Sequence, residues 1–146
     1  MLGGSLTVTG FSFSIPVGAT VDGIEVNLER RQTGVATGIA DHSMYLWKNG
    51  TLGMNNLSTA SPWPTSFVVK TFGGPTNKWG ETSLTPDMVN SAGFGFVQAV
   101  SNSHASSALT AEIDYGTMTV YYTPLGGSVY DSFMDLIRSF FRVLKK

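Results

Sequence analysis

The alternation of apolar and polar residues between positions 5 and 123 predicts a series of short β-strands. In "DGIEVNLER", Ile24, Val26 and Leu28 alternate with polar residues, as in a strand with one buried and one solvated face. Similar runs occur in "SLTVTGFSFSI", "HSMYLWKNGTL", "SFVVKTFGG", "GFGFVQAVSN" and "ALTAEIDYGTMTVYY". Short strands separated by turns rich in glycine and proline predict an all-β protein, an antiparallel β-sandwich of jelly-roll-like form.

Turn residues predict where these strands end. Pro16 and Gly18 end the first strand, because proline lacks the N–H that a ladder needs and glycine tolerates a positive φ. Asp22-Gly23 predicts a turn before the second strand. Asn49-Gly50 is the pair preferred in a type I′ hairpin.

Other local signals predict bulges and a single helical turn. The parity of the apolar positions changes at Gly10 and again at Gly116, where we expect β-bulges. Thr85 followed by Pro86 predicts the N-cap and first residue of one helical turn.

The pattern changes to that of a helix after residues 124–127, which form a Gly-rich joint. In 128–146 the apolar residues gather on one half of a helical wheel and the charged residues on the other. The sequence therefore predicts a β-sandwich domain over 1–123, the joint, and an amphipathic C-terminal α-helix over 128–146. The apolar face that we expect to carry assembly consists of Val129, Phe133, Leu136, Ile137, Phe140, Phe141 and Leu144.

This apolar face needs a cover, because an isolated helix of this length is marginal in water. Packing against other copies of the chain or in a partner's groove is the cover we favour. Packing back onto the chain's own sandwich is the second option. Lying on a membrane is the third, since basic residues dominate the polar face near its end.

The amino-acid composition limits the class of protein and the partners that we expect. Charged residues make up 13% of the chain, about half the usual share, which favours extracellular, virion or tightly assembled proteins. The chain has no cysteine, which excludes disulfides, thiolate zinc sites and cysteine nucleophiles. With a net charge of −1, the chain has no overall electrostatic attraction for the phosphates of nucleic acid, so we expect no nucleic-acid partner.

Five stretches together resemble a known class of domain: "GFSFSIPVGATVDGIEVNLERR", "SMYLWKNG", "WPTSFVVKTFGGPTNKWG", "LTPDMVNSAGFGFVQAV" and "AEIDYGTMTVYY". In order and content they resemble the β-sandwich structural domains of tailed-bacteriophage and prophage virion proteins. The resemblance covers about residues 6 to 123 and leaves out the C-terminal segment. It implies a non-enzymatic structural role in a virion or at a cell surface, with no catalytic residues and no cofactor.

One departure from this resemblance bears on assembly. Such domains usually have more sequence before the "GFSF" strand, which contributes at least one further strand. Only "MLGGSL" and a few more residues precede it here, so we expect an open sheet edge that another chain or the C-terminal helix covers.

No pattern indicates catalysis or a metal site. His42 and His104 are the only histidines, and no G-x-S-x-G motif accompanies them, so we expect no catalytic residues and no zinc site. The aspartates do not form a calcium-binding loop. Arg30-Arg31 is interpreted as a small, solvent-facing basic spot at a strand end.

These observations predict a capsid decoration protein or a head or tail fibre component, located in the virion or else at a cell surface. It would form homo-oligomers, a trimer being one option, and dock on other virion proteins. One alternative is a carbohydrate-binding or adhesin module that uses Trp63 and Trp79, whose simpler role is to cap the core. Another alternative is a peripheral membrane protein that uses the C-terminal helix.

Overall fold

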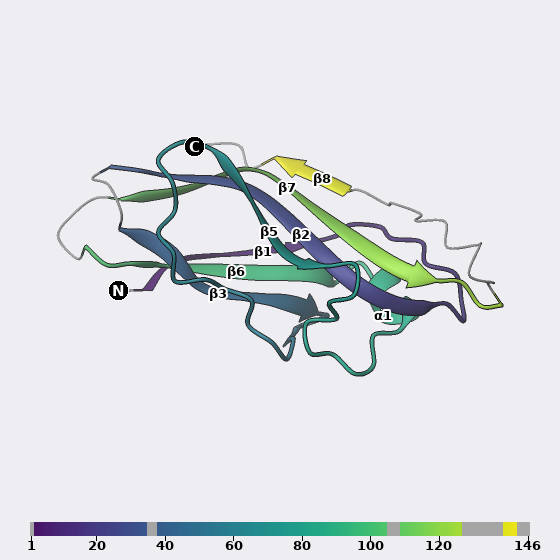
Figure 1. Ribbon diagram of the computed structural model, residues 1–146. Coiled ribbons are helices and arrows are strands. Elements are labelled where there is room, and N and C mark those ends of the chain that lie inside the picture. The colour runs from purple at the N-terminus through teal and green to yellow at the C-terminus, as the bar shows by residue number, and fades with distance from the viewer. Residues whose placement is uncertain (1, 35–37, 105–108, 127–138, 143–146) are drawn as a thin grey trace.

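The computed structural model describes residues 2–34, 38–104, 109–126 and 139–142. These residues form mostly β-strands in two antiparallel sheets, and the described ranges contain one short helix (Figure 1). The first sheet has the order β1 (Leu2–Thr9), β6 (Phe94–Asn102), β3 (Ile39–Lys48) and β4 (Thr51–Leu52). The second sheet has the order β5 (Val68–Gly74), β2 (Thr20–Thr33), β7 (Thr110–Thr123) and β8 (Ser139–Arg142). The helix α1 spans Pro86–Asn90.

The chain passes repeatedly from one sheet to the other, so most neighbouring strands are distant in sequence. One buried cluster contains side chains of both sheets, among them Leu28 from β2, Leu46 from β3 and Phe96 from β6. Each of these three side chains is fully buried. The all-β class expected from the alternation is therefore confirmed, and its apolar positions form the core.

Two local signals are confirmed in detail. Asn49 and Gly50 both have positive φ, 51° and 98°, as a type I′ turn requires, and they join β3 to β4. Thr85 is the N-cap of α1, and its hydroxyl accepts a hydrogen bond of 3.3 Å from the Met88 N–H.

The first predicted strand is shorter than expected. Instead of a bulge, Gly10 marks the end of β1 at Thr9, and its φ of +80° turns the chain away. Phe11, Phe13 and Ile15 still alternate inward and are buried, although they join no ladder. The side chain of Asn90 takes the place of a neighbouring strand, because it accepts from the Ile15 N–H (2.8 Å) and donates to the Ile15 carbonyl (2.9 Å).

The Asp-Gly pair expected as a turn before the second strand forms a different feature. Asp22-Gly23 is a bulge inside β2 and not a turn, since Val21 pairs with Tyr122 and Gly23 with Tyr121. A Cβ at position 23 would lie 2.3 Å from the carbonyl oxygen of Gly74, so this close approach of β5 requires glycine.

The change of parity in β7 comes from a bulge two residues before the expected position. Glu29 pairs with Tyr115 and Arg30 with Ile113, which leaves Asp114 as the extra residue in place of Gly116.

The predicted C-terminal helix is wrong at four positions. Ser139–Arg142 form β8, which pairs antiparallel with Tyr115–Met118 of β7. The physical reason is that β7 would otherwise present unpaired N–H and C=O groups along this edge, and adjacent phenylalanines suit a strand. The remaining residues of 128–146 lie outside the described part of the chain, and the helix there stays a prediction.

Candidate functional site

The most unusual feature of the described chain is a buried polar cluster around Asp41, which we call the Asp41 cluster (Arg30, Asp41, Thr59, Trp63 and Gln98). The Arg30 guanidinium and the Asp41 carboxylate form an ion pair with side chains 5% and 0% exposed. Asp41 Oδ1 also accepts hydrogen bonds of 2.9 Å from Trp63 Nε1 and from Gln98 Nε2. Asp41 Oδ2 accepts from the Thr59 backbone N–H (3.2 Å) and hydroxyl (3.1 Å). Both carboxylate oxygens are therefore committed to protein donors.

Strand alternation delivers two of these side chains to the interior. Arg30 continues the inward face that Ile24, Val26 and Leu28 begin on β2. Gln98 likewise follows Phe96 on the inward face of β6. The expectation that Arg30 faces solvent is wrong, because the residue is only 4% exposed.

A bulge in β3 places the Asp41 side chain on the buried face of the sheet. Asp41 pairs with Val100 and Ser43 with Ala99, so His42 is an extra residue on β3. This shift of parity places Asp41 on the same buried face as Met44, whereas His42 is exposed. No simple alternation through β3 would have predicted an inward aspartate.

Trp63 lies in the long connection between β4 and β5, and its backbone forms hydrogen bonds with two strands. Its backbone N–H donates to the Ile39 carbonyl of β3 (2.8 Å). Its backbone carbonyl accepts from Gln32 Nε2 of β2, and Gln32 Oε1 accepts from the N–H groups of Gly38 (3.1 Å) and Ile39 (2.9 Å). The indole is thereby fixed between the two sheets.

The charges of the cluster are balanced internally. Burial lowers the pKa of Arg30, and the charge and hydrogen bond of Asp41 oppose that lowering. The guanidinium also lies 4.6 Å from the centre of the Trp63 ring and 5.5 Å from that of Phe72. An arginine keeps its charge under such conditions. The arrangement therefore joins β2, β3, β6 and the Trp63 connection through one buried carboxylate.

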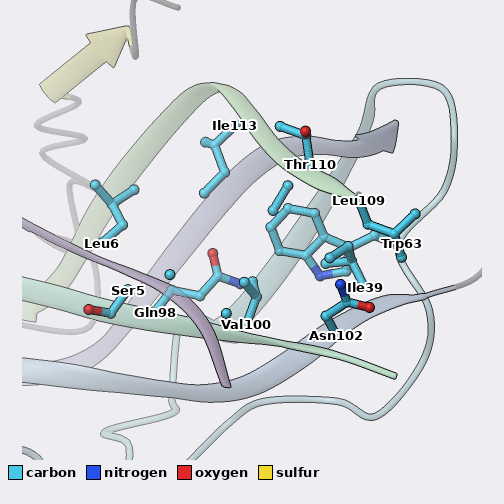
Figure 2. A pocket seen from close by; sticks show the side chains of 13 residues that line it. Ser5, Leu6, Ile39, Trp63, Gln98, Val100, Asn102, Leu109, Thr110 and Ile113 are labelled. Carbon is cyan, nitrogen blue, oxygen red and sulfur yellow. The ribbon is translucent and has the colours of Figure 1, made fainter. Parts of the chain in front are cut away.

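A cavity of about 500 Å³ adjoins the Asp41 cluster (Figure 2). Leu6 of β1 and Val100 of β6 line one side, and Ile113 of β7 lines the other. The Trp63 ring and the Gln98 amide form the boundary between the cavity and the cluster. None of the described residues that line the cavity carries a charge.

The tryptophans expected as possible sugar platforms are both buried. Trp63 is 2% exposed, and Trp79 is 0% exposed and donates its indole N–H to the Ile24 carbonyl (2.9 Å). Carbohydrate stacking requires an exposed ring face, so this burial argues against the glycan-binding hypothesis and favours a core role.

The two histidines lie on exposed positions, His42 on β3 and His104 after β6. In the described ranges, no three His, Cys, Asp or Glu side chains form a group that could hold a metal ion. Asp22 accepts from the Thr123 hydroxyl (2.7 Å), and Asp87 lies in the first turn of α1. These aspartates thus have local structural roles.

The seven apolar residues expected to carry assembly fall mostly outside the described chain. Phe140 and Phe141 belong to β8. The residues that lie outside the described ranges are Val129, Phe133, Leu136, Ile137 and Leu144.

The described segments include no helix with the length and hydrophobicity needed to span a membrane.

Comparison with known proteins adds no identification: no protein-family model matches the chain, and no curated protein and no solved structure matches it.

Proposed function

We propose that this chain is a non-enzymatic structural protein of a virion, a capsid decoration protein or a head or tail fibre component, that assembles through an open sheet edge. The observation that carries the proposal is the composition of β1. This strand has eight residues, "LGGSLTVT", without a charge or a proline. Its outer side pairs with no strand of the described chain. Such an edge is a template for pairing with another chain.

The other edge strands of the described chain are protected in ways that β1 is not. The strand β4 has only two residues, β8 has only four, and β5 carries Lys70. Short length and an edge lysine are both devices that prevent unwanted pairing. The bulge at Gly3 and Gly4 interrupts β1, so the regular part of the open edge is Ser5–Thr9.

Two further arguments give the proposal its setting. The low content of charged residues fits a protein whose surface is largely buried in an assembly, because charged residues are depleted at the centres of interfaces. The resemblance of residues 6 to 123 to phage structural domains directs the proposal to virions, with other virion proteins as the docking partners. The passage of the chain between two sheets that share one buried cluster favours the jelly-roll-like β-sandwich assigned from the sequence.

The test is the concentration dependence of mass in solution, measured by sedimentation equilibrium on the full chain. Wild-type protein should form a defined oligomer. Thr7 and Thr9 are exposed on β1, and replacing both by lysine should raise the dissociation constant about tenfold or more. A variant with Thr76→Lys and Thr82→Lys, which adds the same charge at exposed loop positions, should assemble like wild type.

A wild-type chain that stays monomeric at all concentrations, or an edge variant that assembles normally, would refute pairing through β1. In the second case Phe133→Glu and Leu136→Glu would decide whether the predicted apolar face of the C-terminal segment carries the assembly. Loss of assembly in these variants alone would move the interface to that segment.

A further inference from the structure

The cavity beside the Asp41 cluster holds one polar atom whose bonding is incomplete. Gln98 is 2% exposed, and its amide nitrogen donates to Asp41 Oδ1 at 2.9 Å. Its amide oxygen has no hydrogen-bond partner within the described residues. Figure 2 shows this oxygen directed away from β6, toward the side of the cavity that Ile113 forms. A buried acceptor in this state lowers stability unless a donor reaches it.

The orientation of the amide is fixed by its neighbour. Rotating the Gln98 amide by half a turn would bring its oxygen against the Asp41 carboxylate, which can only accept hydrogen bonds. The repulsion between the two oxygens excludes that arrangement. The Asp41 cluster therefore holds an acceptor in place at the wall of the cavity.

The cavity is suited in size and chemistry to a small organic molecule. Its volume of about 500 Å³ exceeds the space of a single water and lies within the range of ligand sites, about 300–1,000 Å³. The walls are mainly apolar, with Leu6, Trp63 and Ile113 among them. Ser5, Asn102 and Thr110 add uncharged polar side chains, and none of the described lining residues is charged. A charged ligand would lose its hydration there without gaining a counter-ion.

We propose that this cavity binds a small, neutral, mostly apolar molecule that donates one hydroxyl or N–H hydrogen bond to Gln98 Oε1. The apolar body of the ligand lies between Leu6 of β1 and Ile113 of β7, against the Trp63 indole. The site combines one oriented polar contact with mainly apolar walls, as small-molecule sites do. The inference does not depend on the proposed assembly through β1.

The test compares two probes of nearly equal shape on the full chain, 2-naphthol and its methyl ether. Only 2-naphthol can donate to Gln98. Isothermal titration calorimetry should show 1:1 binding of 2-naphthol, with the methyl ether weaker by about tenfold or more. In ¹H–¹⁵N spectra the Gln98 side-chain amide signals should shift on addition of 2-naphthol.

Two matched variants locate the binding. Ala111 lines the cavity and forms none of the hydrogen bonds of the Asp41 cluster, and Ala111→Phe should abolish binding of 2-naphthol by filling the space. Val69→Phe adds similar bulk on β5 at an exposed position outside the cavity and should leave the affinity unchanged. Gln98→Met should remove the preference for 2-naphthol over the ether.

Three results would overturn the proposal. The first is equal affinity for the two probes, and the second is undiminished binding to the Ala111→Phe variant. The third is a lack of binding of 2-naphthol to wild type. If the oligomer mass of Ala111→Phe is then also lower than that of wild type, the cavity holds an inserted side chain of a second copy.

Discussion

At the scale of single residues, Asp41 is the group on which the interior depends most. It balances the buried charge of Arg30 and accepts from Trp63, Gln98 and Thr59. Asp41→Asn keeps the shape but leaves a buried guanidinium without a counter-charge, and turns one acceptor oxygen into a donor. We expect the free energy of unfolding to fall by ~3–5 kcal/mol, measured by urea denaturation.

The matched comparison is the more exposed pair of Arg31 and Glu112, whose side chains are 29% and 13% exposed and lie 2.8 Å apart. Solvent screens this pair, so Arg31→Gln should lower the free energy of unfolding by about 1 kcal/mol or less. If Asp41→Asn were as mild as Arg31→Gln, the carboxylate would not be the centre of the buried network.

Part of the Asp41 cluster, together with Gln32 beside it, could have been predicted from the sequence. The inward alternation of β2 runs on through Arg30 and Gln32, and that of β6 runs on through Gln98. Extending the apolar pattern to the next residue of the same parity would have marked all three as buried. Asp41 was out of reach, because a bulge at His42 turns it inward and no residue type signals that bulge.

At the scale of elements, α1 secures a stretch of chain that has no strand partner. Asn90 at its end bonds both the N–H and the carbonyl of Ile15, 75 residues away in sequence. Asn90→Ala should therefore lower the free energy of unfolding by ~1–3 kcal/mol and speed hydrogen exchange of the Ile15 amide. Asn90→Asp keeps the acceptor but sets a carboxylate oxygen against the Ile15 carbonyl, so it should lower the free energy of unfolding at least as much as Asn90→Ala.

The control for this element is the other end of the same helix. Thr85→Ala removes the N-cap bond to Met88 and should cost about 1 kcal/mol without a selective change at Ile15. Equal exchange of the Ile15 amide in the Asn90→Ala and Thr85→Ala variants would show that Asn90 acts only through the stability of α1.

The elements also show which signals in a sequence carry structural information. The turn at Asn49-Gly50 and the cap at Thr85 were predicted correctly because each depends on the backbone preferences of adjacent residues. The bulge at Asp22-Gly23 was predicted as a turn, because the same dipeptide tolerates either conformation and the partner strand decides between them. The strand Ser139–Arg142 was missed for the same reason, since its partner is an edge of β7.

At the scale of the whole molecule, alternation predicted the all-β class but could not give the order of the strands. In the first sheet β1 pairs with β6, and in the second β2 pairs with both β5 and β7. Such pairings join residues far apart in sequence and depend on how the two sheets share a core. The cavity was equally hidden, because it arises where β1, β6 and β7 meet.

The same shared core leads to a prediction for the unfolding of the molecule. The main cluster takes side chains from both sheets, and a smaller cluster at the cavity contains Ile39, Trp63 and Val100. Ile113 packs against both clusters and connects them. Neither sheet can then lose its partner and keep a buried face, so the two should unfold together in one cooperative transition.

This prediction is checked by following urea unfolding with tryptophan fluorescence and with far-ultraviolet circular dichroism. The two curves should share one midpoint. Leu28→Ala in the main cluster and Val100→Ala beside the cavity should each move both curves together, the first by ~2–5 kcal/mol in unfolding free energy because Leu28 is fully buried. A fluorescence change that precedes the loss of circular dichroism in Val100→Ala would instead show that the cavity end opens independently of the main core.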